Sequence, residues 1–147
     1  MLAAMLESIA ITTRSDPLSR FQPVELRVVR HTDRLKEVVE FYRGRIGLPE
    51  LGRFTGHDGY DGVFLGIPAA GAHLEFTTGG DHPAPEPHPE SLLVLYVETQ
   101  EDLDAIAARV EQGETTPANP YWQRNARAFA DPDGYQVLLT LRPSRDP

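Results

Sequence analysis

The stretch Ala130-Asp131-Pro132-Asp133-Gly134-Tyr135-Gln136-Val137-Leu138-Leu139, close to the carboxyl end, decides the fold. Pro132 presets a φ of about −65°, the aspartate side chains can bond the turn backbone, and Gly134 can adopt a positive φ. An alternating strand follows, with Tyr135, Val137 and Leu139 on one face and Gln136, Leu138 and Thr140 on the other. The stretch therefore predicts a tight turn that leads into a closing strand.

Upstream, residues 79–90 predict an extended connector. They read Gly-Gly-Asp-His-Pro-Ala-Pro-Glu-Pro-His-Pro-Glu, with four prolines at alternate positions. Proline removes a backbone donor and fixes φ, so this segment is unsuited to a helix or a central strand. The connector divides the chain into two blocks of similar length.

Both blocks predict the order β-α-β-β-β. The first has a strand at 24–28, a helix from a cap at Thr32 or Asp33 to about Gly44, and strands at 51–57, 61–68 and 72–78. The second has a strand at 93–97, a helix from Thr99 to about Gly113, and strands at 114–117, 125–131 and 135–141. The apolar positions of each opening strand, each helix and each closing strand correspond, which indicates an internal repeat.

The closing hairpin, together with Glu40-Phe41-Tyr42-Arg43 and the following Gly47-Leu48, resembles the vicinal-oxygen-chelate superfamily. This superfamily includes glyoxalase I, extradiol dioxygenases, and the fosfomycin and bleomycin resistance proteins. The segments 56–62, 73–76 and 119–122 are similar to an uncharacterised bacterial glyoxalase-like subgroup.

The resemblance covers about residues 23–142 and implies an α+β fold. Two βαβββ modules, at 23–78 and 91–142, would form a cleft between curved mixed sheets with the helices outside. Residues 1–22 would be an N-terminal extension. Because many relatives dimerise, the resemblance also allows a homodimer.

The composition narrows the classes of partner. The chain has 147 residues, 40% of them hydrophobic, and a formal net charge of −8. That balance argues against a nucleic-acid partner or an anionic membrane surface, both of which attract clustered positive charge. The absence of cysteine excludes disulfides and thiolate ligands. The N-terminal stretch is neither a convincing signal peptide nor a membrane span, so a cytoplasmic location is expected.

The resemblance also predicts where a metal would bind, and the sequence departs from that pattern. Metal-using members take ligands from the first and last strands of each half, and Glu75 matches one such position. Its counterpart in the second half is Leu138, where the metal-using members usually have a glutamate. Glu25 or Arg27 falls at the corresponding position of the first strand, and the second half offers no evident ligand. We therefore expect neither a metal nor another cofactor.

The candidate site consists of polar and aromatic residues expected to face the cleft. Glu75 is either a buried carboxylate paired with Arg27 or Tyr96, or a ligand anchor or general base. His73 is either a proton shuttle or a structural histidine. Tyr121 and Trp122, expected in a loop or an edge strand, either stack on a planar ligand or pack the loop onto the sheet. The other candidates for ligand contact are Arg27, Tyr96, Arg127 and Gln136.

Two functions from different classes remain open on the sequence alone. One is a protein that binds a small organic molecule without a metal, like the drug-sequestering members of the superfamily. The other is an enzyme, either a metal-dependent lyase or dioxygenase or a metal-free enzyme that uses Glu75 as a base.

Overall fold

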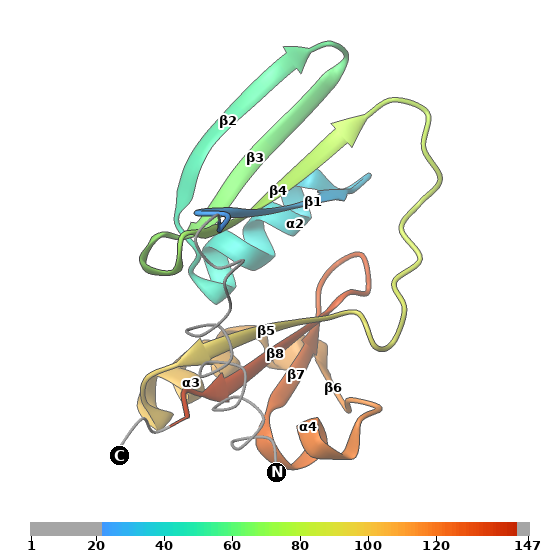
Figure 1. Ribbon diagram of the computed structural model, residues 1–147. Helices are drawn as coiled ribbons and strands as arrows, with labels where there is room; N and C mark the ends of the chain where they lie inside the picture. Colours follow the sequence, from blue (N-terminus) through green and yellow to red (C-terminus); the bar gives the residue numbers. More distant parts are fainter. Residues whose placement is uncertain (1–21, 144–147) are drawn as a thin grey trace.

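The structure, a computed structural model, describes residues 22–143. The predicted N-terminal extension lies almost wholly outside the described residues. Two four-stranded sheets, one above the other in Figure 1, make up the molecule. The connector, residues 80–91, passes along one side from the first sheet to the second.

The first module contains the upper sheet. Its elements are β1 (Leu26–His31), α2 (Leu35–Val39), the π-helix η2 (Glu40–Ile46), β2 (Glu50–His57), β3 (Tyr60–Ile67), the short 3-10 helix η3 (Pro68–Ala70) and β4 (Ala72–Gly79). The second module contains β5 (Leu92–Val97), α3 (Gln100–Val110), the 3-10 helix η4 (Glu111–Gly113), β6 (Glu114–Thr115), α4 (Pro120–Asn125), β7 (Arg127–Ala130) and β8 (Gln136–Leu141).

The two sheets have the same topology. Their strand orders are β1-β4-β3-β2 and β5-β8-β7-β6, and in each the opening strand lies parallel to the closing one. The remaining pairs are antiparallel. The predicted α+β fold of two βαβββ modules is thus confirmed.

The turn before β8 has the predicted chemistry. Asp131 Oδ1 accepts hydrogen bonds from the backbone N–H groups of Asp133 and Tyr135, at 2.8 and 3.0 Å. Gly134 has a φ of 91°, a conformation that costs a side-chain-bearing residue energy.

The helix starts were predicted with mixed success. Thr99 caps α3, because its side chain accepts a hydrogen bond from the Asp102 N–H. The predicted cap of the first helix at Thr32 or Asp33 is wrong, since α2 begins after Arg34. Thr32 is instead buried before the helix, where its hydroxyl accepts a hydrogen bond from the Arg34 N–H.

One core joins the two modules. The main helix of each module packs on one face of its own sheet, and α3 also contacts η2. The fully buried side chains include Tyr42 and Phe76 from the first module and Phe129, Val137 and Leu139 from the second. The helices therefore lie outside the sheets, as predicted, and also meet one another where the modules join.

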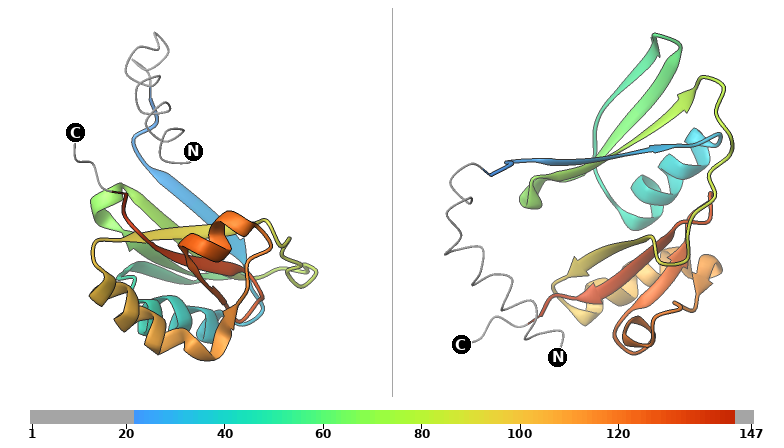
Figure 2. Two further views of the ribbon diagram at one scale, coloured as in Figure 1. Left: turned by 90° about the horizontal axis from the view of Figure 1, so that it is seen from below. Right: turned by 45° about the vertical axis from the view of Figure 1, so that its right-hand side comes forward.

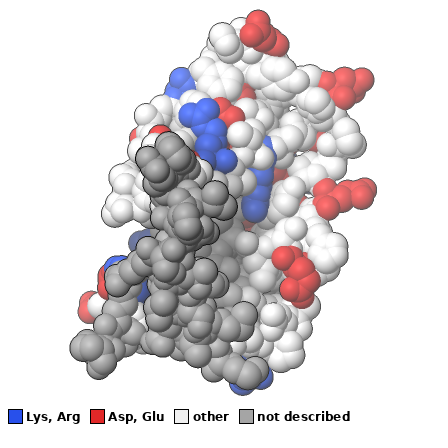
Figure 3. Space-filling view, in the orientation of Figure 1, with Lys and Arg blue, Asp and Glu red and all other residues white. Residues whose placement is uncertain are grey.

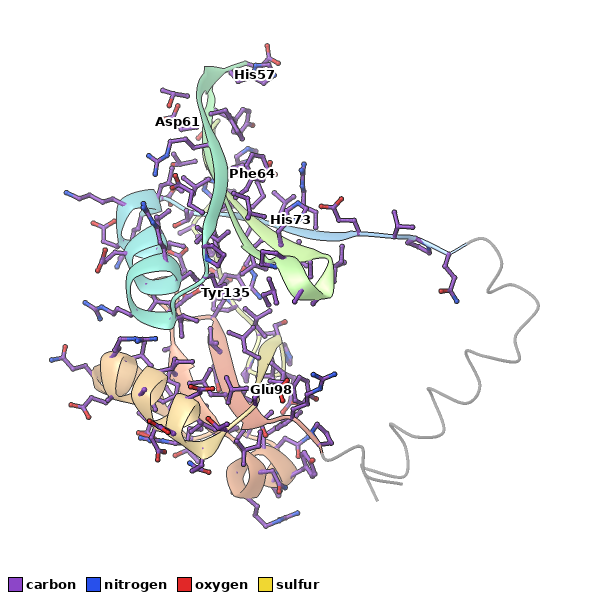
Figure 4. The ribbon with its side chains drawn as sticks, turned by 90° about the vertical axis from the view of Figure 1, so that its left-hand side faces the viewer. His57, Asp61, Phe64, His73, Glu98 and Tyr135 are labelled. Atoms are coloured by element: carbon purple, nitrogen blue, oxygen red, sulfur yellow. The ribbon has the colours of Figure 1, made fainter. Side chains whose placement is uncertain are left out.

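Polar contacts across this junction come from residues far apart in the sequence. The Tyr42 hydroxyl donates a 2.6 Å hydrogen bond to Asp131 Oδ2. The Arg30 guanidinium lies 4.0 Å from the centre of the Tyr135 ring, and Tyr135 lies between the modules in Figure 4. Arg109 donates to the backbone carbonyls of Arg45 and Ile46. These contacts fix the modules relative to one another.

Residues 120–125 form a helix, α4, where the sequence predicts a loop or an edge strand. The side chain of Asn119 caps the helix by accepting from the Tyr121 N–H, and Pro120 occupies the first turn. Figure 2 shows α4 on the face of the second sheet opposite α3.

No helix within residues 22–143 combines the length and the apolar character needed to cross a membrane.

Candidate functional site

The face of the first sheet that points away from α2 carries the polar candidates. Strand register aligns Arg27 with His73, and Val29 with Glu75, across the β1–β4 pair. Paired residues of neighbouring strands share a face, so these side chains lie on the side opposite the core residues Leu74 and Phe76. Figure 4 shows His73 and Phe64 on this helix-free side.

The Arg27 guanidinium is the centre of this group. Its Nε donates a 2.7 Å hydrogen bond to His73 Nε2. Its carbon lies 4.7 Å from the centre of the Phe64 ring, and its Nη1 lies 3.9 Å from Glu75 Oε1. The Arg27 side chain is nevertheless 51% exposed, so a charged group is both held in place and accessible.

His73 holds the Arg27 guanidinium in place, and burial and its own contacts restrict the His73 ring. Only 8% of the residue is exposed. Because Nε2 accepts from Arg27, the ring proton is on Nδ1, which lies 3.2 Å from Glu25 Oε1. Both ring nitrogens are therefore engaged, an arrangement that favours the structural interpretation of His73 over the proton shuttle.

Glu75 is a half-buried carboxylate whose described partner is Arg27. Its side chain is 13% exposed, and the 3.9 Å separation from Arg27 exceeds hydrogen-bonding distance. Within residues 22–143 the Glu75 carboxylate accepts no hydrogen bond from a side chain or from a backbone outside the strand ladder. Such a group can accept a donor from a ligand.

An apolar surface lies beside these polar groups. Gly62 and Gly66 of β3 face the same side as Glu75 and His73, and an added Cβ there would overlap Phe54 and Leu51 respectively. The Phe54 and Leu51 side chains thus occupy the space directly above these two glycines, which serve as a glycine floor. The Phe54 and Phe64 rings are 5.9 Å apart, and Leu51 is 52% exposed.

The charge on this side is not evenly distributed. In Figure 3, basic side chains gather in the middle of the upper half, which the first module forms, while acidic side chains stand mostly towards its upper and right-hand margins. An overall acidic chain therefore presents a local basic centre on this face.

The corresponding face of the second sheet is partly covered by the chain itself. Leu138 is fully buried on this face, and the neighbouring Thr140 donates a 2.7 Å hydrogen bond to the Asn125 carbonyl at the end of α4. Gln136 is half-buried, and its Oε1 lies 3.5 Å from the Thr115 hydroxyl. Tyr96, at the edge strand β5, is 47% exposed.

Tyr121 and Trp122 are half-buried in α4, with their ring centres 4.9 Å apart in an edge-to-face arrangement. Tyr121 also lines a hollow of about 450 Å³ at the end of the second sheet, together with Arg124 and Arg127.

Arg127 is paired in register with the core residue Leu139, so its side chain leaves the strand on the helix side of the sheet. There it binds Glu114 through two hydrogen bonds of 2.9 and 3.0 Å. The bonds from Arg127 lower the pKa of the Glu114 carboxyl.

The predicted site residues thus form two groups. In the first module Arg27 contacts both His73 and Glu75, whereas the second module holds Tyr96, Tyr121, Trp122, Arg127 and Gln136. Within the described part of the chain, no hydrogen bond, ion pair or ring contact joins the two groups. A ligand site shared by both groups stays a prediction.

A second hollow, of about 730 Å³, lies on the helix side of the first sheet, between α2, η2 and the β2–β3 hairpin. Its lining includes Lys36, Arg43 and Arg53, and none of the predicted site residues.

The residues around Glu75 do not fit the metal site that the superfamily resemblance implies. The guanidinium of Arg27, itself a cation, lies beside the carboxylate. The equivalent position of the second module is the fully buried Leu138. Across residues 22–143, no three histidine, aspartate or glutamate side chains are grouped so as to hold a metal ion.

Comparison with known proteins agrees with this two-module architecture. Residues 26–77 match the YycE-like N-terminal domain and residues 90–140 match the YycE-like C-terminal domain. The chain belongs to the YycE-like family. The uncharacterised YycE protein of Bacillus subtilis strain 168 is 41% identical over 125 residues, which cover 82% of this chain and 90% of that protein.

Solved structures place the YycE-like fold among the glyoxalases and resistance proteins. The crystal structure of YycE from B. subtilis, a protein of unknown function, superposes with a TM-score of 0.75 at 38% identity, covering 86% of this chain and 95% of that one. Glyoxalase I of Leishmania major gives 0.63 at 20% identity, covering 82% and 87%. The fosfomycin resistance protein FosX of Mesorhizobium loti gives 0.57 at 13% identity, covering 83% and 92%. At these identities the last two show the fold alone, so the predicted resemblance to the vicinal-oxygen-chelate superfamily is confirmed at the level of the fold.

Sequence reasoning missed part of the surface around Arg27. It gave no ligand-binding role to Phe54 or Phe64, and considered Glu25 only as a metal ligand. A signal was present: Gly52 and Phe54 on one strand, and Gly62, Phe64 and Gly66 on the next, alternate with period two. Glycine inside a strand often marks a place where another group approaches the backbone closely.

Proposed function

We propose that this YycE-like protein binds a small organic molecule, without a metal, on the helix-free faces of its sheets, with the polar anchors around Arg27. The observation that carries the proposal is an arginine held by His73 and Phe64 while half of its side chain remains exposed. An arginine that only interacts with water at the surface would not need contacts of this kind from neighbouring side chains. Binding sites for small molecules combine an apolar surface with a few fixed polar groups.

The metal-dependent alternative has weaker support, because Leu138 stands where metal-using members usually have a glutamate and the Arg27 cation lies beside Glu75. The alternative of a metal-free enzyme that uses Glu75 as a base has one observation in its favour: no side chain within residues 22–143 donates a hydrogen bond to that carboxylate. Turnover of a bound compound that is lost in Glu75→Gln would favour the enzyme. The cytoplasmic location and the lack of a nucleic-acid or membrane partner stay predictions.

Arg27→Gln is expected to weaken binding of any ligand that uses this site by about tenfold or more, the equivalent of one charge-assisted interaction. Ligand-observed NMR with a panel of small anionic, cationic and zwitterionic metabolites and drugs measures this loss. Arg53→Gln is the matched control, because Arg53 is paired with Val63 and faces the helix side of the same sheet.

Elemental analysis of the wild-type protein, purified without chelator, is expected to give no stoichiometric divalent metal. One equivalent of metal that is lost in Glu75→Ala would contradict the proposal.

Fluorescence of Trp122, the sole tryptophan, reports whether the second module takes part. A ligand that depends on Arg27 and also shifts the Trp122 emission would contact both modules. A ligand that depends on Arg27 and leaves the emission unchanged would bind the first module alone.

We also propose that the protein forms a homodimer. Within residues 22–143, both opening strands are sheet edges, and their exposed apolar side chains include Leu26, Val29 and Tyr96, at 60%, 54% and 47%. Unpaired edges with apolar side chains are typical of surfaces that a partner covers.

Light scattering after size exclusion is expected to give twice the chain mass for the wild type and the monomer mass for Leu26→Lys. Thr55→Lys, at an exposed position of β2, controls for the added charge. A monomeric wild type at micromolar concentration would contradict the dimer.

A further inference from the structure

We propose that the Arg27 site takes a zwitterion: a compound with a carboxylate and an ammonium group close together beside a flat apolar body, as in an aromatic amino acid. This inference rests on the proposed function and names the class of ligand for the same site. It follows from three features of the site, namely the balance of charge, the Glu75 carboxylate, which has an ion pair but no side-chain hydrogen bond within residues 22–143, and the apolar surface over Gly62 and Gly66.

The balance of charge disfavours a ligand with a single charge. Arg27 is the cation, and two carboxylates flank it, Glu75 directly and Glu25 through His73. A simple anion attracted to Arg27 would also approach both carboxylates, and a simple cation attracted to the carboxylates would approach Arg27. A zwitterion can place each of its charges beside the opposite one.

The carboxylate of the ligand would meet the exposed part of Arg27. Because Nε already donates to His73, the donors left for a ligand are on the two terminal nitrogens of the guanidinium. Parallel hydrogen bonds from these nitrogens to two carboxylate oxygens are a common and specific geometry. His73 is a positioning residue here, since it orients the guanidinium and leaves the terminal nitrogens accessible.

The ammonium of the ligand would meet Glu75. This carboxylate faces the same side as Arg27, is 13% exposed, and has a 3.9 Å ion pair in place of a hydrogen bond. An ammonium group offers three donors and can satisfy an acceptor of this kind. The 3.9 Å between Arg27 and Glu75 is also compatible with the short separation of the two charges in an amino acid.

The apolar body would lie on Phe54, Phe64 and Leu51. Phe64 contacts Arg27 directly and Phe54 lies next to Phe64, so the apolar surface begins where the charged groups end. The glycine floor keeps Phe54 and Leu51 close to the sheet, which suits a planar group better than a branched one.

Three matched probes test the proposal by calorimetric titration: phenylalanine carries both charges, 3-phenylpropanoate only the carboxylate, and 2-phenylethylamine only the ammonium. Phenylalanine is expected to bind about tenfold more tightly than either of the others, because each analogue lacks one ion pair. Equal affinity of the wild type for phenylalanine and for either analogue would overturn the proposal.

Two variants assign the charges. Arg27→Gln is expected to bind phenylalanine no more tightly than 2-phenylethylamine, whereas Glu75→Gln is expected to bind it no more tightly than 3-phenylpropanoate. Arg53→Gln and the exposed Glu37→Gln are the matched controls and should keep the wild-type order. Thermal unfolding of every variant confirms that it is folded.

The outcomes separate this inference from the proposed function. If none of the three probes binds but other compounds of the NMR panel lose binding in Arg27→Gln, the site exists and the zwitterion is wrong. If no compound in either experiment depends on Arg27, both the zwitterion and the proposed function are wrong.

Discussion

Asp131→Ala is expected to lower the free energy of unfolding by about 3–5 kcal/mol, because three buried or half-buried donors lose their acceptor at once. These donors are the Tyr42 hydroxyl and the backbone N–H groups of Asp133 and Tyr135. The first belongs to the other module, so the loss affects the junction as well as the turn. Chemical denaturation followed by circular dichroism measures it.

Tyr42→Phe and the double variant are the controls. Tyr42→Phe leaves one Asp131 oxygen without its donor and is expected to cost about 1–3 kcal/mol. If the hydroxyl and the carboxylate interact as described, the double variant should cost less than the sum of the two single changes. Strict additivity would show that the hydrogen bond contributes nothing to stability.

The same aspartate gives the stability a pH dependence. Burial raises the pKa of the Asp131 carboxyl above its ordinary 3.8, although the hydrogen bonds from Tyr42 and the turn act in the opposite direction. A raised pKa means that the folded state holds the proton more tightly, so this contribution is present below 3.8 and is lost as the pH rises through the folded-state value. The advantage of the wild type over Asp131→Asn should therefore be larger in acid than at neutral pH.

Leu138→Glu is expected to destabilise the protein by about 4 kcal/mol or more at neutral pH, without creating a metal site. Leu138 is fully buried beside the strand partner Ala128, with α4 on the same face. A carboxylate there would have to ionise out of water or remain protonated. Its raised pKa makes the loss smaller in acid and larger as the pH rises. Denaturation at several pH values and elemental analysis measure the two expectations.

Leu138→Met tests whether the loss comes from charge and not from a changed shape. A volume-conserving apolar exchange is expected to cost less than about 1.5 kcal/mol. A Leu138→Glu protein as stable as the wild type, or one that binds a stoichiometric metal, would mean that α4 moves away from this face.

The fold was predictable because the turn, capping and strand patterns of the sequence are consistent with the internal repeat. The Asp-Pro-Asp-Gly turn, the cap at Thr99 and the alternating strands each identify one element, and the repeat then arranges them. Asn119-Pro120 is also a helix-start signal, an N-cap followed by proline, and the short run of aromatic residues after it obscured the helix.

The site was predictable only within one module. Strand alternation places Arg27, His73 and Glu75 on one face, and in the structure Arg27 contacts the other two. Alternation says nothing about which segment covers a sheet, so the position of α4 over Leu138 could not be predicted. Strand alternation also does not predict how the two modules meet. The hydrogen bond between Tyr42 and Asp131, which are 89 residues apart in the sequence, could therefore not be predicted.

The glycines beneath Phe54 and Leu51 have a consequence for selectivity. Because Phe54 and Leu51 fill the space above Gly62 and Gly66, the body of a ligand would lie on an exposed apolar surface with no pocket to match its outline, and such a surface cannot reject one ring system in favour of another of similar thickness. Discrimination in the proposed site would therefore rest on the head group, whose charges must align with fixed partners, while the remainder of the molecule could vary. Such a surface suits a broad set of chemically related guests better than a single dedicated one.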